Sequence, residues 1–407
     1  MTLDEALALD AADPLSACRE RFALPPRTIY LDGNSLGPLP ANAATRIAET
    51  VKAEWGNDLI ASWNKHDWIG APQRIGARIA PLIGALPDEV LVSDSTSINL
   101  FKLLAAALGA RPGRSTILSE RGNFPTDLYI AQGLAALVPG VGIVTVGADE
   151  ITAALDDDTA VLMLTHVDYR SGARLDMARL TAAAHAAGAL ALWDLSHSAG
   201  AVAVDLNDAG ADLAVGCGYK YLNGGPGAPA FLFVAKALQP TLTSPLSGWF
   251  GHVDPFAFEA DYRPAEGIAR FQSGTPSIIA MAALEAGLAT FDGVAIAALE
   301  AKSRSLSQAF IGQVEARCPE LSLASPRNPA ARGSHVVFAH PDGFALMQAL
   351  IERGVIGDFR APDLIRFGFA PLYNGFADVW RAVEIIAEAL ATRAYDQPRF
   401  KRRSRVT

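Results

Sequence analysis

Short apolar runs alternate with longer segments of helical periodicity through the middle of the chain, and this alternation constrains the fold more than any other feature. Seven runs are short, rich in Val, Ile and Leu, and bounded by Gly, Pro or Asp, as strands are. They cover residues 90–93, 116–119, 143–146, 160–165, 189–194, 212–216 and 230–234. Helical patterns lie between several of them, at 97–108, 126–137 and 177–187. Such repetition predicts an α/β fold with a mostly parallel seven-stranded sheet between helices.

Beyond about Ser277 the pattern changes to long helical segments with few strands. Helices are expected at 278–291, 294–316, 344–352 and 377–392, and short strands at 335–339 and 365–369. This pattern indicates a smaller α+β C-terminal domain. We therefore expect three parts: an N-terminal segment at 1–50 that packs with the small domain, a large ligand-binding domain at 51–285, and the small domain at 286–407.

Composition excludes several classes of protein. Half of the 407 residues are hydrophobic and 19% are charged, so the chain can bury a large core and is not globally disordered. The formal net charge is −9 and no broad basic stripe is present, which argues against a nucleic-acid partner. The five basic residues within 399–406 are expected to form a solvated chain end.

The three cysteines, Cys18, Cys217 and Cys318, are widely separated. They make neither a disulfide framework nor a paired zinc motif, and they fit a reducing compartment. The first residues are acidic and resemble no signal peptide, and no apolar run reaches about 18 residues. We expect a cytoplasmic protein with no membrane segment and no metal site.

Ligands of parallel sheets bind outside the carboxyl ends of the strands, so the residues that follow each strand matter most. Ser95, Thr96 and Ser97 precede a helical run, where hydroxyls and free N–H groups suit either an anion such as a phosphate or a plain helix cap. Phe124 and Asp127 follow the second strand and suit either a ligand ring or loop packing.

Two further strand ends hold a carboxylate and a lysine. Asp194 ends one strand with His197 three residues later, and it suits either a protonated ring nitrogen of a cofactor or the cap of a turn. Lys220 lies between Tyr219 and Tyr221, before a glycine-rich turn that lacks the P-loop order. A lysine in such a place can form a Schiff base with an aldehyde. Together the four strand ends supply the parts that bind pyridoxal 5′-phosphate.

At this point the sequence resembles the kynureninase family of fold-type I pyridoxal-phosphate enzymes. The resemblance runs in order from about Tyr30 to the last helix. Its motifs are YLDGNSLG at 30–37, FPTD at 124–127, WDLSHS at 193–198, GYKYLNGGPG at 218–227, GWFGH at 248–252, FQSGTP at 271–276 and, after Arg366, PLYN at 371–374. The YKYLN and GWFGH runs are specific, whereas DxSH alone is shared by many relatives.

The resemblance implies a role for each matching residue. Lys220 would form the Schiff base, Asp194 would bind the pyridine nitrogen with His197 beside it, and Phe124 would stack on the ring. The expected catalytic residues are Lys220, Tyr219 and Asp194. The expected cofactor-binding residues are Thr96, Ser97, Phe124, Thr126, Asp127, Thr165, Asp194, His197, Tyr219, Lys220, Trp249 and Thr275.

The resemblance also implies a homodimer in which Trp249 and Thr275 reach the phosphate of the partner subunit. Asn34, Ser35 and Trp63 would line the pocket for an aryl ketone, with Trp68 as an alternative to Trp63. Arg366 would hold the substrate carboxylate as a bidentate clamp, which suits guanidinium geometry.

The implied activity is hydrolytic cleavage of the Cβ–Cγ bond of L-kynurenine to anthranilate and L-alanine, with 3-hydroxykynurenine a poorer substrate. That reaction belongs to tryptophan degradation by the kynurenine pathway, which also supplies NAD biosynthesis. A cysteine desulfurase or an aminotransferase of the same fold is the alternative, although no motif marks Cys318 as reactive. A catalytically silent dimeric scaffold is a further alternative, which retention of Lys220 and Asp194 disfavours.

Overall fold

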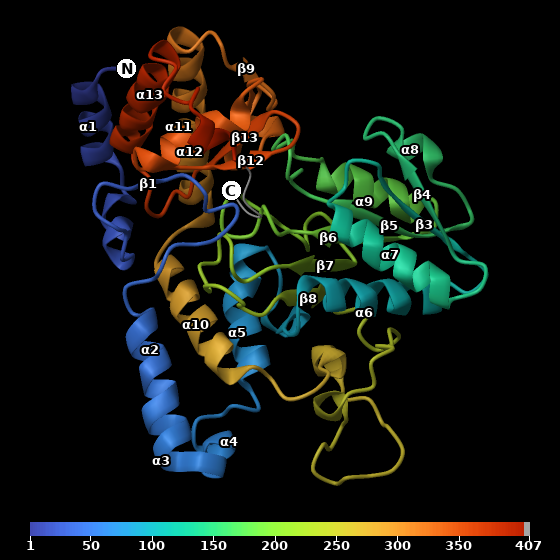
Figure 1. Ribbon diagram of the computed structural model, residues 1–407. Coiled ribbons are helices and arrows are strands. Elements are labelled where there is room, and N and C mark those ends of the chain that lie inside the picture. The colour runs from blue at the N-terminus through green and yellow to red at the C-terminus, as the bar shows by residue number, and fades with distance from the viewer. Residues whose placement is uncertain (403–407) are drawn as a thin grey trace.

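The computed structural model describes residues 1–402, and its larger part is built on one seven-stranded sheet (Figure 1). The strand order is β2-β8-β7-β6-β5-β3-β4. Every pairing is parallel except those of β8, which runs against both β2 and β7. The strands are β2 (Val90–Val92), β3 (Thr116–Glu120), β4 (Gly142–Val146), β5 (Thr159–Thr165), β6 (Leu190–Asp194), β7 (Leu213–Gly216) and β8 (Phe231–Val234). The predicted mostly parallel sheet is confirmed.

Both faces of this sheet are buried, which explains why its strands are almost continuously apolar. Within β5, Val161 and Met163 join the hydrophobic core on one face, and Leu162 and Leu164 join the core on the other. Helices α6 and α7 pack into the first core, and α5, α9 and α10 pack into the second. These helices are α5 (Ala71–Ile79), α6 (Thr96–Gly109), α7 (Pro125–Leu137), α9 (Met177–Ala186) and α10 (Ile278–Leu288), and the one-turn α8 (Ile151–Ala154) follows β4.

The C-terminal part has its own antiparallel sheet and its own core. The strand order is β12-β13-β10-β9, and α11, α12 and α13 pack around it at the top of Figure 1. The elements are α11 (Ile296–Arg317), β9 (Ser322–Leu323), β10 (His335–Ala339), α12 (Gly343–Glu352), β12 (Asp358–Arg360), β13 (Leu364–Gly368) and α13 (Phe376–Ala391).

The N-terminal segment contacts this C-terminal part. Helix α1 (Leu3–Ala12) lies beside α13, and β1 (Ile29–Tyr30) pairs in parallel with β11 (Val355–Ile356). The chain then continues through α2 (Ala43–Glu49), a π-helical segment (Thr50–Trp55), α3 (Gly56–Asp58) and α4 (Ser62–Lys65). The boundaries expected at residues 50 and 285 both fall inside helical segments, whereas domain boundaries usually fall in exposed linkers. The three-part division stays a prediction.

Among residues 1–402, no single helix combines the length and apolar composition needed to span a membrane. Only the pair Ile278–Phe291 and Ile296–Arg317 passes that test when taken together, across a bend of 81°. Of the basic tail, Arg399 and Lys401 lie in a short 3-10 turn, and residues 403–407 lie outside the part that the structure describes.

Candidate functional site

A cavity of about 340 Å³ lies where the carboxyl ends of the parallel strands meet. Strands β2, β3, β5, β6 and β7 all end at this edge of the sheet, so residues far apart in sequence converge there. Ten of the twelve predicted cofactor-binding residues line the cavity. The full lining is Ser95, Thr96, Ser97, Phe124, Thr126, Asp127, Thr165, Asp194, Ser196, His197, Cys217, Tyr219, Lys220, Ala228 and Ala230.

The start of α6 forms one wall and provides hydrogen-bond donors. Ser95 caps the helix, and its side chain accepts a hydrogen bond from the backbone N–H of Ile98 at 3.4 Å. Within the described chain, the backbone N–H groups of Thr96 and Ser97 have no hydrogen-bond partner. Free N–H groups at a helix N-terminus favour an anion. The helix cap is therefore observed, and the free N–H groups make this wall the candidate cup for a phosphate, a role that stays a prediction.

Lys220 also lines the cavity and is half-buried. Its Nζ lies 3.2 Å from Nε2 of His197, which also lies 3.2 Å from the backbone oxygen of Asn34. Burial, reinforced by the charge of Lys220, holds the pKa of His197 well below its usual range, so the ring is neutral. A neutral imidazole beside the cavity-lining amine forms no ion pair with it, so the amine can react with a ligand.

Two buried carboxylates share the floor of the cavity. Asp194 accepts hydrogen bonds from the backbone N–H and the hydroxyl of Ser196, at 2.8 and 2.6 Å. Burial raises the pKa of Asp194 and, together with the charge of Asp194, raises that of Asp127 well above its usual range. Carboxylates in this setting are stabilised by a cation placed between them. A protonated pyridine nitrogen is such a cation.

Aromatic rings flank the same space. The Phe124 ring centroid lies 5.9 Å from Lys220 Nζ and packs edge-on against Tyr169, with centroids 5.2 Å apart. An amine, a buried carboxylate, an aromatic ring and a set of free N–H groups thus surround one cavity. This donor set fits the aldehyde, ring nitrogen, ring face and phosphate of pyridoxal phosphate.

The N-terminal segment packs directly against the lysine loop. The backbone N–H of Gly37 donates to the Tyr219 oxygen at 2.8 Å, and a Cβ on Gly37 would lie 2.5 Å from the oxygen of Lys220. Only glycine allows this close approach. Asn34 is fully buried nearby, and its side-chain amide has no hydrogen-bond partner among the described residues. The DGNSLG motif thus places Asn34 and Ser35 beside the site.

Arg366 differs from the open clamp that the sequence suggested. Its guanidinium is buried and pairs with both oxygens of Asp358, with Nε–Oδ1 at 2.6 Å, and donates to the backbone oxygen of Tyr169. Nη2 also lies 3.3 Å from the hydroxyl of Ser35. The bidentate face is therefore occupied by Asp358, and a substrate carboxylate would have to bind the single N–H that remains on Nη1. A buried arginine needs such a partner, which the sequence pattern did not reveal.

Asp32 adjoins the Asp358–Arg366 pair and makes stability depend on pH. Burial and the charge of Asp358 raise the pKa of Asp32 from 3.8 to about 7. Between these values the folded protein holds a proton that the unfolded chain has lost, so the contribution of Asp32 to stability is full below about pH 4 and is lost as the pH rises to about 7. Asp32→Asn should therefore gain stability relative to the wild type over this range. Urea unfolding at both ends of the range measures the difference, and a difference that does not change with pH would contradict the raised pKa.

Trp63 does not line the cavity of its own chain. It stacks on Phe250 with centroids 5.7 Å apart, and Trp68 packs edge-on against Trp63 at 5.6 Å. Trp249, adjacent to Phe250, and Thr275 are exposed and also lie outside the cavity. The substrate role expected for Trp63 and the partner-reaching roles expected for Trp249 and Thr275 stay predictions, because a single chain does not test them.

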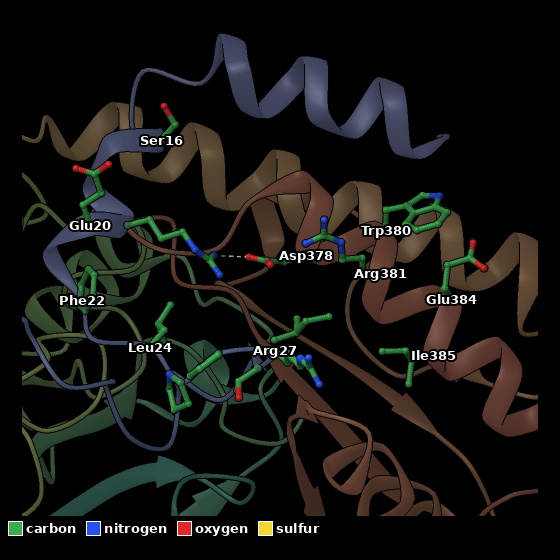
Figure 2. Close-up of a pocket in the computed structure, with 15 residues that line it drawn as sticks. Ser16, Glu20, Phe22, Leu24, Arg27, Asp378, Trp380, Arg381, Glu384 and Ile385 are labelled. Carbon is green, nitrogen blue, oxygen red and sulfur yellow. Dashed lines mark hydrogen bonds and ion pairs between the residues drawn. The ribbon is translucent and has the colours of Figure 1, made fainter.

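A groove larger than this cavity contains none of the predicted site residues. It has a volume of about 880 Å³ and lies between the N-terminal segment and α13, where Arg19 pairs with Asp378 at 2.6 Å (Figure 2). Choosing the candidate site by cavity volume alone would therefore have pointed to this groove instead. Within residues 1–402, no group of three or more His, Cys, Asp or Glu side chains is arranged to hold a metal ion.

Several residues of the site escaped the sequence reasoning. Ser196 and Cys217 line the cavity, and Asp358 and Tyr169 hold Arg366. Ser196 lies within the WDLSHS motif and could have been found from it. Asp358 and Tyr169 carry no local signal, because only the packing of the C-terminal sheet brings them to Arg366.

Comparisons with known proteins identify the family of the chain. A family model described as the kynureninase C-terminal domain matches residues 299–386. The kynureninase of Burkholderia mallei (strain SAVP1) is 54% identical over 415 aligned residues, and that of Pseudomonas fluorescens is 52% identical over 414, each covering 100% of both chains.

Among solved structures, the fold is similar to that of cysteine desulfurases. The apo enzyme from Thermococcus onnurineus NA1 has a TM-score of 0.76 at 20% identity and covers 96% of this chain and 99% of its own. The cysteine desulfurase CsdA from Escherichia coli has a TM-score of 0.75 at 20% identity, over 93% and 98% of the two chains. At this identity the likeness shows the fold alone, whereas identity above one half along the full length shows the family. The chain belongs to the kynureninase family.

Proposed function

We propose that the protein is a pyridoxal-phosphate-dependent kynureninase that hydrolyses the Cβ–Cγ bond of L-kynurenine to anthranilate and L-alanine, with 3-hydroxykynurenine a poorer substrate. The observation that supports it best is the meeting of Lys220, Asp194, Phe124 and the free N–H groups of α6 at one cavity. Bound pyridoxal phosphate supplies an aldehyde that condenses with amines and a ring that accepts electrons from the substrate carbon.

Lys220 holds the cofactor at rest and moves protons during turnover. Its Nζ is the amine that faces the cavity, with neutral His197 as its neighbour at 3.2 Å. With pyridoxal phosphate bound, Lys220 would hold the cofactor and would be the base placed to remove the substrate Cα proton and to return a proton to the product. Asp194 keeps the ring nitrogen protonated, because a buried carboxylate is stabilised by a cation.

Tyr219 is suited to donate a proton near the substrate carbonyl. Burial raises the pKa of Tyr219, so its hydroxyl stays protonated at neutral pH. Its ring lies with its centroid 5.7 Å from Lys220 Nζ, which places an acid and a base at the same wall of the cavity. Substrate binding falls to Arg366, Ser35 and Asn34, and the carboxylate would bind the one guanidinium N–H that Asp358, Tyr169 and Ser35 leave free.

The active unit is a homodimer in this proposal. Trp249, Phe256 and Phe258 are exposed and pack with the buried Phe250, on which Trp63 of α4 stacks. Exposed apolar patches of this kind mark protein interfaces. We assign Trp249, Thr275 and Trp63 to the cavity of the partner subunit. A cytoplasmic location stays a prediction, based on three free cysteines.

A cysteine desulfurase with the same fold would need a reactive thiolate, and this chain offers no suitable one. Burial raises the pKa of the Cys318 thiol to about 11, and that side chain is fully buried at the end of α11. Cys217 lines the cavity, but burial raises its pKa as well. A buried thiol with a raised pKa is a poor nucleophile.

Incubation of the purified protein, loaded with pyridoxal phosphate, with L-kynurenine tests the proposal directly. Anthranilate fluorescence should appear together with an equal amount of L-alanine. L-Cysteine in place of L-kynurenine should release no sulfide. Sulfide without anthranilate would replace the proposed activity with the alternative one.

A further inference from the structure

Lys102 is a fully buried lysine on α6 that none of the roles above uses. Its side chain is 0% exposed, and its ammonium donates to Ser93 Oγ at 3.2 Å, to the Phe271 oxygen at 2.7 Å and to the carboxylate of Asp94. All three N–H groups are therefore engaged. Burying an ammonium is costly unless it is fully paired, so an apolar residue would suit this helix position better unless the charge has a task.

Through Asp94, Lys102 is linked to the phosphate cup at the start of α6 in the chain's own cavity. Asp94 directly precedes the Ser95 cap and has a φ of +47°, a conformation that costs a non-glycine residue energy. Its carboxylate also accepts from Ser93 Oγ at 2.7 Å, and its backbone oxygen accepts from the N–H of Ala230 at 2.9 Å. Lys102 thus holds the residue that leads into the free N–H groups of α6.

Through the same Asp94, Lys102 is also linked to the loop that carries Thr275. The carboxylate of Asp94 accepts from Ser273 Oγ at 3.2 Å, and the Ser273 backbone oxygen accepts from the N–H of Phe250 at 3.1 Å. A Cβ on Gly248 would lie 2.3 Å from that same oxygen, so the two loops are in close contact. Residues 248–252 and 271–276 therefore pack as one unit, called here the crossing loops, which bears both Trp249 and Thr275.

We propose that Lys102 is a positioning residue that holds two phosphate-binding parts at once: the cup at the start of α6 in its own cavity, and the crossing loops that reach the cavity of the partner subunit. This inference rests on the proposed function, including the homodimer. Each Lys102 then acts on both cofactor sites of the dimer, although it touches neither cofactor.

The first test is the pyridoxal phosphate concentration that half-saturates the protein. Borohydride reduction fixes the cofactor on Lys220, and mass spectrometry counts the modified lysine as the cofactor concentration is varied. Lys102→Met should raise the half-saturating concentration about tenfold or more, since it removes hydrogen bonds made by a charged group. The matched control is Lys302→Met, which removes another buried lysine that is paired with Asp13 at 2.6 Å and does not line the cavity. This control should lower the free energy of unfolding and leave the half-saturating cofactor concentration unchanged. If Lys102→Met behaves like Lys302→Met, the proposal is wrong.

Mixed dimers separate the effect of Lys102 on the cup of its own chain from its effect, through the crossing loops, on the cavity of the partner subunit. One chain carries Lys220→Ala, so that only the cavity of the other chain can be labelled. With Lys102→Met on the chain that keeps Lys220, the labelled cavity has an altered cup. With Lys102→Met on the Lys220→Ala chain, the labelled cavity has a normal cup but altered crossing loops. Both dimers should need more cofactor than the dimer of a wild-type and a Lys220→Ala chain. If the second dimer has the same half-saturating cofactor concentration as the reference dimer, the proposed action across the interface is wrong.

Ser273→Ala keeps the proposal testable if Lys102→Met does not fold, because it removes only the bond between Ser273 and Asp94. It should raise the half-saturating cofactor concentration when placed on the Lys220→Ala chain and leave that concentration unchanged when placed on the other chain. Equal effects from both placements would count against the proposal. Failure of the proposed function gives a different result, because the wild-type dimer would then take no label on Lys220 at any cofactor concentration.

Discussion

Lys220→Ala should abolish turnover of L-kynurenine, with a loss of about 10⁴-fold, the upper end of what one positioned proton-transfer group contributes. The lysine is expected to hold the cofactor and to move the Cα proton, and no other lysine lines the cavity within the described chain. The variant should also lose the visible absorbance of cofactor bound to lysine. Stopped assays of anthranilate, together with an absorbance spectrum, measure both effects.

The matched control for this variant is Lys236→Ala, which removes an exposed lysine paired with Asp88. Its activity and spectrum should equal those of the wild type, because surface ion pairs contribute little. Borohydride should label the wild type at Lys220 and leave Lys220→Ala unlabelled. A label at another lysine, or turnover in the alanine variant, would show that the reactive amine lies elsewhere.

Asp194→Asn should lower kcat by about 10³-fold while the cofactor remains bound, since a neutral amide cannot stabilise a protonated ring nitrogen as a carboxylate does. The side chain is nearly isosteric, so the contacts with Ser196 are disturbed less than by deletion. Cofactor content, measured after gel filtration, separates loss of chemistry from loss of binding. A variant with normal kcat would refute the electronic role of Asp194.

Asp212→Asn provides the comparison, because Asp212 is another buried carboxylate and directly precedes β7, at the edge of the sheet opposite to that where Asp194 ends β6. It accepts from the backbone N–H of Ala191 at 2.8 Å and contacts His185 at 2.7 Å. Its replacement should reduce stability and leave kcat unchanged. Equal losses of kcat in both variants would mean that any damage to the sheet lowers activity.

The strands were predictable because burial on both faces leaves a local signal in each of them. The expected run at 160–165 and the observed β5 (Thr159–Thr165) differ by one residue, and the strand at 335–339 matches β10 (His335–Ala339). The antiparallel direction of β8 was not predictable, because strand direction depends on the path of the connecting chain. The N-terminal helices α1, α2 and α5 were missed as well.

The site was predictable to the extent that each residue follows a strand of a parallel sheet. Thr96, Phe124, Asp194 and Lys220 carry that signal, and the structure brings all four to one cavity. Arg366 had a recognisable motif, but its pairing with Asp358 did not, because a hydrogen-bond partner across a sheet leaves no trace in local spacing.

By itself, the sequence determined the alternation of strands and helices, the polar residues at the strand ends and the family motifs, because each depends on neighbours along the chain. Tertiary structure alone decided that Lys220 opens onto the cavity, that Asp358 occupies the fork of Arg366, and that Lys102 joins the cup to the crossing loops. Those features depend on distances between segments that are remote in sequence. The free-energy cost of burying these charged groups, which makes their pairing necessary, arises only once the core has formed.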